Sequence, residues 1–288
     1  MPLSELVQQV LNGIVMGSVY VLIALGLTVI FGILGIAHFA HGSVAMFGGY
    51  LTFWITQRFG LSLFPAMLLA MPAGAVVGAL LERLAYRPVR DAPPINGFIV
   101  ALGLTMLIER LNLLLFGPDQ LVIQTPYRSV FTFGGVSVVE LRVYVLAITA
   151  ILLVAIALLL NRTSMGRAVR AVAQNRAAAT LMGIDVNRIS LVVFAVSSAL
   201  GVAAGALIGA MLALAPGLGE NLVVKGFAIL ILGGLGSISG AVIGGLALGI
   251  VEALAAGFLS SAYKDVIAFA IMILVILFRP QGLLGRAS

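Results

Sequence analysis

Long runs of apolar residues constrain this chain more than any other feature, because few architectures can bury them. Of the 288 residues, 62% are hydrophobic and only 9% are charged, whereas a soluble domain has about 25% charged residues. Ten acidic and sixteen basic residues cannot supply the polar surface that a soluble protein of this length needs. We therefore expect an integral membrane protein surrounded by lipid.

The apolar runs also predict how often the chain crosses the membrane. A helix needs roughly 20 residues to span the hydrocarbon, and seven runs meet this need, near 6–30, 40–57, 63–82, 97–116, 143–160, 191–214 and 264–279. The segment 223–258 is too long for one helix and contains the glycine-rich stretch GGLGSISGAVIGG, which predicts two short or re-entrant helices. We predict an all-α polytopic bundle of about eight spans, with seven to nine as the range, in one transmembrane domain over 1–288.

Arginine predicts the orientation of these spans, because cytoplasmic loops of membrane proteins are rich in basic residues. Three connections carry most of the arginines: Arg83, Arg87 and Arg90 after the third run, Arg162, Arg167, Arg170, Arg176 and Arg188 after the fifth, and Arg279 and Arg286 in the tail. We therefore place all three in the cytoplasm: the connection after the third run, the segment 161–190 and the C-terminus. Alternation then places the N-terminus outside, together with 117–142 and its PDQ and TFGG turn signals.

Glycine spacing predicts close helix packing within the bundle. Gly201, Gly205 and Gly209 recur every four residues, so they share one helix face where a neighbouring backbone can approach. Four more glycine pairs have the same spacing. Together they predict a tightly packed bundle.

The residue types present argue against an enzyme, a metal centre or a nucleic-acid-binding protein. A phosphate-binding P-loop needs Lys followed by Ser or Thr, but Lys225 precedes Gly and Lys264 precedes Asp. The chain has no cysteine, no paired carboxylates at helical spacing and no common hydrolase motif. His38 and His41 are weak grounds for a metal site, and the bases are not interleaved with aromatic residues. We expect no cofactor, no metal and no nucleic acid.

Ionisable residues inside apolar runs are costly and therefore raise functional hypotheses. Glu109 and Arg110 lie in the fourth run, and Glu252 follows the glycine-rich stretch. In a stand-alone ion-coupled carrier, Glu109 and Glu252 would carry the coupling ion. The alternative, which we favour, is that these side chains are held by neighbours at a helix end or in the bundle interior.

Two small-residue breaks resemble each other and are our candidates for backbone near a transport pathway. HGSVAMFGGYL at 41–51 and SGAVIGGLALG at 239–249 each place small residues ahead of an apolar helix, as broken helices of transporters do. The candidate pathway residues are His38, His41, Gly42, Ser43, Gly234, Ser237, Ser239 and Gly240.

The segment 166–188 is the most unusual part of the chain, because it is basic and too polar to cross a membrane. Asn161, Thr163 and Ser164 are possible N-caps, 168–182 is rich in alanine, and Gly183 is a possible C-cap. These features predict one surface helix. It would lie on anionic lipid headgroups or dock into a groove of a cytoplasmic partner.

Four motifs, which together span essentially the whole chain, resemble one protein family. NGIVMGSVYVLIALGLTVIFGILGIAHFAHG (12–42), RAVAQNRAAATLMGIDVNRIS (170–190), GGLGSISGAVIGGLALGIVEAL (233–254) and LFRPQGLLG (277–285) are similar to LivH-type permease subunits of branched-chain amino acid ABC importers. The resemblance implies a bacterial inner-membrane subunit without ATPase activity. Its implied partners are a second, LivM-like permease, two cytoplasmic ABC ATPases and an extracytoplasmic substrate-binding protein.

The resemblance also implies a role for the basic segment. In such importers, a cytoplasmic helix between spans couples the permease to an ATPase, and the match places it near 166–183. The implied coupling residues are Arg170, Ala171, Asn175, Ala179, Gly183 and Asp185. Permeases of urea and short-chain amide importers look similar, so the cargo stays open between apolar amino acids and these small amides.

Overall fold

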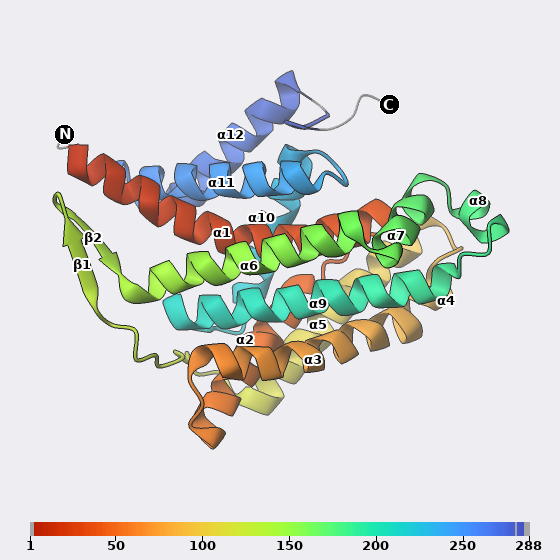
Figure 1. Cartoon of the computed structure of the whole chain (residues 1–288), viewed down its shortest axis with the longest axis horizontal. Coiled ribbons are helices and arrows are strands. Elements are labelled where there is room, and N and C mark those ends of the chain that lie inside the picture. The colour runs from red at the N-terminus through yellow and green to blue at the C-terminus, as the bar shows by residue number, and fades with distance from the viewer. Residues whose placement is uncertain (1–2, 280, 285–288) are drawn as a thin grey trace.

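A computed structural model describes residues 3–279 and 281–284 and shows a helical bundle (Figure 1). Arg286, which we expected in the cytoplasm, lies outside the described residues. The elements are α1 (Leu3–Leu34), α2 (His41–Phe59), α3 (Leu63–Leu81), the π-helix η1 (Glu82–Tyr86), α4 (Arg87–Val89), α5 (Pro94–Phe116), β1 (Val130–Phe133), β2 (Val136–Val139), α6 (Glu140–Arg162), α7 (Ser164–Gln174), α8 (Arg176–Leu181), α9 (Val186–Met211), α10 (Leu218–Gly233), α11 (Ile238–Phe258) and α12 (Lys264–Phe278). The predicted all-α membrane class is confirmed.

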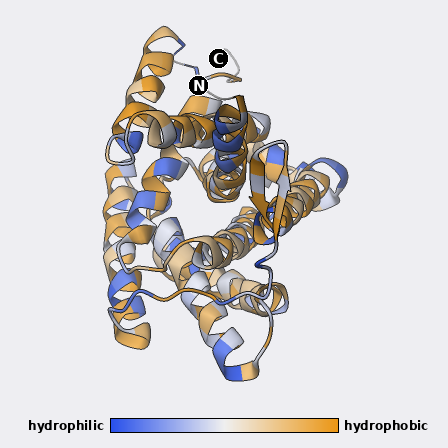
Figure 2. Cartoon of the chain, turned by 90° about the vertical axis from the view of Figure 1, so that its left-hand side faces the viewer, coloured by the Kyte–Doolittle hydropathy of each residue, from blue (hydrophilic) through white to orange (hydrophobic). Residues whose placement is uncertain are grey.

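The helices divide into buried and peripheral ones. Most of α1 and α9 is buried among other helices, whereas α5 and α6 expose most of their apolar side chains. Figure 2 shows that the hydrophobic colour continues along the outer helices. In water such a surface would aggregate, so the exposed apolar side chains are the surface that lipid covers.

Six helical stretches among the described residues are long and apolar enough to cross a membrane: α1, Leu63–Val89, α5, α6, α9 and α11. The predicted number of about eight is therefore not confirmed. Among the additional runs that we counted, α12 has only 15 residues, and α2 carries polar residues at both ends. In the segment 223–258, α10 has only 16 residues.

Glycines let the central helices meet backbone to backbone, as their spacing predicted. A Cβ added to Gly17 of α1 would lie 2.7 Å from the Gly245 carbonyl oxygen of α11. On α9, Gly201 faces the His41 ring, and Gly205 faces the Ala45 carbonyl group of α2. Gly209 instead packs against the side chain of Leu214 in the following loop. Any larger residue at Gly17 or Gly205 would push two helices apart.

The glycine-rich stretch breaks the chain between α10 and α11, in the predicted place. Gly234 has a φ of 100°, which ends α10, and the Ser237 hydroxyl accepts a hydrogen bond from Gly240 N at 3.1 Å and so caps α11. Gly233 and Gly240 touch across the break. The two helices therefore fold back on each other tightly.

A small antiparallel hairpin, β1 with β2, precedes α6. The TFGG turn signal places Gly134 and Gly135 at φ 59° and 81°, as a tight hairpin turn requires. Ser137 N donates to Gln8 Oε1 at 2.8 Å, which attaches the hairpin to the start of α1. The hairpin marks one end of the bundle, and α7 and α8 mark the opposite end (Figure 1).

Candidate functional site

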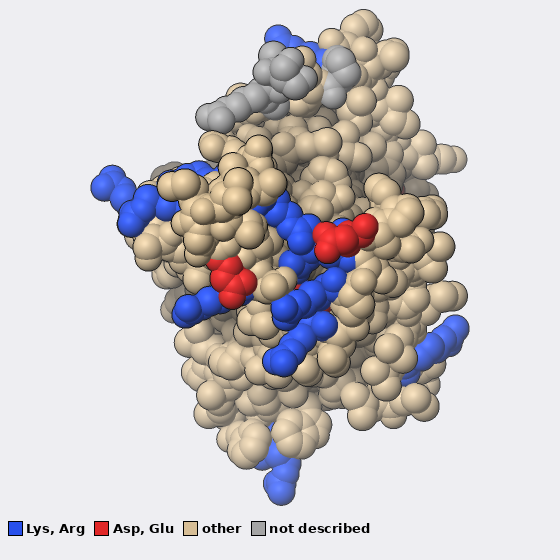
Figure 3. Space-filling view, turned by 90° about the vertical axis from the view of Figure 1, so that its right-hand side faces the viewer, with Lys and Arg blue, Asp and Glu red and all other residues tan. Residues whose placement is uncertain are grey.

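The end of the bundle that carries α7 and α8 is strongly basic, and we call it the basic end. Figure 3 shows this face, with many arginine or lysine side chains and few acidic ones. Its exposed arginines are Arg83, Arg87, Arg162, Arg167, Arg170, Arg176 and Arg188. Seven of the ten arginines that we used to predict orientation thus gather at one end of the folded molecule.

The alanine-rich segment at this end is two helices, so our prediction of one helix over 166–183 is wrong. The Thr163 side chain caps α7 by accepting from Gly166 N at 3.0 Å. At Asn175 the chain becomes extended, and the Asn175 side chain caps α8 by accepting from Ala178 N at 2.9 Å. An asparagine that can cap a new helix competes with continuation of the old one, and this competition outweighs the helix propensity of the alanines.

Three of the six implied coupling residues stabilise the segment itself. Asn175 caps α8, and the Asp185 carboxylate caps α9 by accepting from Asn187 N and Arg188 N. Arg170 donates to the Leu160 carbonyl oxygen at the end of α6. These contacts all lie within the chain, whereas coupling needs contacts with an ATPase. The role of the three residues in coupling therefore stays a prediction.

The other three implied coupling residues differ in exposure. Ala171 is half-buried, and Ala179 is 4% exposed. Gly183 is exposed and has a φ of 81°, which favours glycine because a side chain would be strained there. The positive φ at Gly183 turns the chain from α8 into α9.

The tip of this segment is an apolar surface that the sequence analysis missed. Leu181, the last residue of α8, and Met182, which follows it, are 88% and 82% exposed. Two large apolar side chains exposed on a charged surface are typical of a contact with another protein. The local clue was an apolar pair directly ahead of a turn glycine.

An ion-pair cluster joins the end of α3 to the start of α9, and the sequence analysis also missed it. Arg90 pairs with Glu82, and the two side chains are 4% and 0% exposed. Arg90 Nη1 also donates to Asn187 Oδ1 at 2.9 Å. Burial lowers the pKa of Arg90, and Glu82 opposes this shift, so the guanidinium remains charged.

A π-helix begins at Glu82 and lies between the two paired residues. Pro88 lacks an N–H, and the turn before it widens into η1, in which Glu82 and Tyr86 are both buried. Glu82 follows the buried Gly74 and Gly78 of α3 at four-residue spacing, which places it near the buried face of the helix. This spacing was the available signal.

The two histidines are buried side by side between helices. His38 Nδ1 lies 2.7 Å from Tyr86 Oη, and the His38 and His41 ring centroids are 5.7 Å apart. Both side chains are fully buried. No group of three His, Cys, Asp or Glu side chains that could hold a metal ion occurs among the described residues.

The remaining pathway candidates lie at packing contacts or helix ends. Gly42 packs against Gly219 of α10, and the carbonyl oxygen of Ser43 accepts from Asn112 Nδ2 at 3.1 Å. Gly234 and Ser237 form the break described above, and Ser239 is exposed beside the buried Gly240. None of the eight candidates lines the cavity described next, and their role in a pathway stays a prediction.

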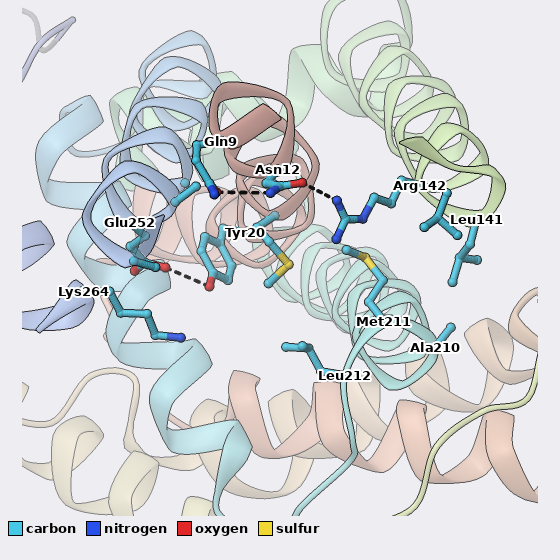
Figure 4. A pocket seen from close by; sticks show the side chains of 15 residues that line it. Gln9, Asn12, Tyr20, Leu141, Arg142, Ala210, Met211, Leu212, Glu252 and Lys264 are labelled. Atoms are coloured by element: carbon cyan, nitrogen blue, oxygen red, sulfur yellow. Dashed lines mark hydrogen bonds between the residues drawn. The ribbon is translucent and has the colours of Figure 1, made fainter. Parts of the chain in front are cut away.

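A cavity of about 440 Å³ opens at the hairpin end of the bundle, between α1, α6, α9 and α11. One wall is polar and includes Gln9, Asn12 and Arg142, and another is apolar and includes Met211 and Leu212 (Figure 4). Its size lies within the range of ordinary small-molecule pockets. A site with these walls suits a small solute that is polar at one end and apolar at the other.

A buried charge cluster borders this cavity. Lys225 Nζ lies 2.8 Å from Glu252 Oε1 and 2.9 Å from Asp265 Oδ1. Glu252 also accepts a hydrogen bond from the Tyr20 hydroxyl at 3.0 Å. The structure therefore holds Glu252 in the bundle interior, as we favoured over the carrier hypothesis. Glu109 is half-buried on α5, a helix that packs on α2 rather than on α11.

Comparisons with known proteins match nearly the whole chain. The family model described as branched-chain amino acid transport system / permease component matches residues 9–276. The chain is 37% identical to the high-affinity branched-chain amino acid transport system permease protein BraD of Pseudomonas aeruginosa, over 97% of this chain and 95% of that protein. It is 36% identical to the permease protein LivH of Escherichia coli, with the same coverage. It is 26% identical to the permease protein LivM of Escherichia coli, over 92% of this chain and 68% of that protein. The matched residues include both the basic end and the cavity.

Proposed function

Because this chain belongs to the family of branched-chain amino acid transport permease components, we propose that it is the LivH-type permease subunit of an ABC importer. The main support is the sequence identity of 36–37%, over 97% of the chain, to two permeases of branched-chain amino acid systems. The subunit moves apolar amino acids inward with ATP that separate subunits hydrolyse. The family match confirms the resemblance seen in the four motifs.

The proposed assembly follows from the family and from the two ends of the bundle. A LivM-like permease forms the other half of the path, as the weaker similarity to LivM supports. The basic end faces the cytoplasm and the two ATPases, because arginine-rich ends are retained there. The hairpin end and the N-terminus then face the substrate-binding protein outside.

Coupling enters through α7, α8 and the turn at Gly183. Gly166 packs against the carbonyl group of Leu160 at the end of α6, and Val169 and Val172 are buried. α7 is therefore attached to the bundle, whereas Leu181 and Met182 extend away from it. The apolar tip would dock in a groove of the ATPase, and closure of the ATPases would move α7, α8 and the attached helices together.

Reconstitution tests the proposed function directly. We reconstitute the assembled complex in proteoliposomes, with the binding protein outside and ATP on the side of the ATPases. The complex is expected to take up leucine, and isoleucine and valine are expected to compete with leucine for uptake. Competition by urea rather than by valine would indicate a short-chain amide importer. Uptake by the chain alone under a sodium or proton gradient would instead show an ion-coupled carrier.

Substitution of the apolar tip tests coupling. Leu181→Asp or Met182→Asp would place a carboxylate in the docking groove, so we expect roughly a tenfold or greater loss of ATPase stimulation by loaded binding protein. The matched controls Leu181→Met and Met182→Leu keep the apolar surface and should retain stimulation. If an intact complex with either Asp variant kept full ATPase stimulation, the apolar tip would not be part of the docking surface.

A further inference from the structure

The cavity at the hairpin end has the chemistry of a solute site within the permease itself. We propose that it binds one zwitterionic α-amino acid with an aliphatic side chain, its carboxylate on Arg142 and its ammonium group toward Glu252. The assignment of the solute class rests on the proposed function, whereas the place of the site rests on this chain's own geometry. It makes the permease a second point of recognition, separate from the binding protein.

Arg142 is positioned in advance for a carboxylate. Its Nη1 donates to Asn12 Oδ1, and Asn12 Nδ2 donates to Gln9 Oε1 at 3.1 Å. Among the described residues, no carboxylate forms an ion pair with Arg142. Figure 4 shows the guanidinium directed into the space between α1 and α9, so a solute carboxylate can complete its charge-assisted hydrogen bonds.

Glu252 supplies the opposite charge on another side of the cavity. Its side chain is only 7% exposed, and the Lys225 ammonium that pairs with it is shared with Asp265. Lys264 also lines the cavity, so two carboxylates face two ammonium groups and these four side chains carry no net charge. Tyr20 orients Glu252 through its hydroxyl group. Glu252 is thus held in place by Lys225 and Tyr20, and as the carboxylate that lines the cavity it is the acceptor that a solute ammonium group would share with Lys225.

The remaining walls select the solute's side chain. Met16, Leu141, Met211 and Leu212 line the cavity, and flexible methionines adapt to differently branched aliphatic groups. A second cavity of about 110 Å³ shares Met16, Tyr20, Leu212 and Lys264 with the first one. The site therefore continues toward Lys225 and the bundle interior.

Photo-leucine, a diazirine analogue of leucine, is the probe that tests this site. In the assembled, nucleotide-free complex without binding protein, we expect it to label peptides that contain Leu141 or Met211–Leu212. Arg142→Gln should raise the photo-leucine concentration for half-maximal labelling about ten- to hundredfold, and Arg142→Lys should restore part of the loss. Arg128→Gln is the matched control, because Arg128 is exposed, donates to Gln124 and does not line the cavity.

A ligand without a carboxylate separates recognition from structural damage. Leucinol keeps the ammonium group and the side chain, so its competition should be equally strong with Arg142 and with Arg142→Gln. Labelling elsewhere, equal labelling of Arg142→Gln, or an equal loss for leucine and leucinol would overturn the site. If any of these three results occurred while the complex still took up leucine with ATP, the proposed site would be wrong but the proposed function would stand. If the wild-type complex did not take up leucine, the proposed function itself would be wrong.

Discussion

The chain contains two clusters in which acidic and basic side chains pair, and the two clusters differ in their surroundings. At the basic end, Glu82 and Arg90 are sealed from solvent at 0% and 4% exposure, and they join α3 to α9 through Asn187. Near the hairpin end, Lys225 pairs with Glu252 and with Asp265, whose side chain is 49% exposed, beside a cavity. A sealed pair fixes how helices meet, whereas Glu252 of the other cluster also lines a cavity, where we propose that it meets a solute.

The sealed pair should show the largest loss of stability when it is broken. Glu82→Gln leaves the Arg90 charge buried without its partner, which costs about 3–5 kcal/mol. The expected result is a lower unfolding temperature and poor recovery of the detergent-solubilised complex on size-exclusion chromatography. Because a buried pair can be replaced by uncharged residues at little cost, Glu82→Gln with Arg90→Met should recover much of the loss. A double variant no more stable than Glu82→Gln would show that the pair is not the relevant contact.

The open cluster should tolerate the same kind of change better. Glu252→Gln leaves Lys225 with Asp265 at 2.9 Å, and the new amide oxygen can still accept from Tyr20. We expect a loss of about 1.5–3 kcal/mol, as for a hydrogen bond to a charged group, measured by the same unfolding assay. A loss equal to that of Glu82→Gln would mean that the two clusters do not differ as their exposure indicates.

An exposed ion pair near the sealed one gives the smallest expected effect. Arg176 Nη1 and Asp91 Oδ1 are 3.1 Å apart, but their side chains are 42% and 86% exposed. Surface pairs contribute little because water screens them, so Asp91→Asn should leave the unfolding temperature within error. A clear drop would show that α8 depends on this contact, and exchange of amide hydrogens over 176–182 would locate it.

The bundle could be predicted from the sequence because its causes are local. Runs of about 20 apolar residues set most of the helices, glycine at 234 set the break, and the clustering of arginines indicated the basic end. The spacing of Gly201, Gly205 and Gly209 indicated close packing, although Gly209 meets a loop and not a helix. Each of these signals lies within one segment, and so does its structural effect.

The site could be predicted only in part, because its contacts join distant residues. Tyr20 and Glu252 are separated by 232 positions, and no periodicity in either segment indicates that they meet. The break at Asn175 had a local signal, but the alanines around it favoured a continuous helix. Glu82 pairs with Arg90 across the widened turn before Pro88, a turn that a regular helical period does not predict. These three features depend on tertiary contacts or on competition between local conformations, and the composition of a segment reports neither.

The glycine contacts between helices have a consequence for how this gene can vary. Every missense change of a glycine codon adds at least a Cβ, and at Gly13, Gly17, Gly205 and Gly249 that atom would collide with the backbone of another segment. Almost every single-nucleotide change that replaces one of these glycines should therefore be harmful. At Gly103 and Gly217, where a Cβ would meet nothing within 4 Å, the same mutation is sterically free. Variation among natural copies should consequently fall unevenly on the glycines, and a map of the helical glycines that never change would trace the helix contacts of the folded bundle.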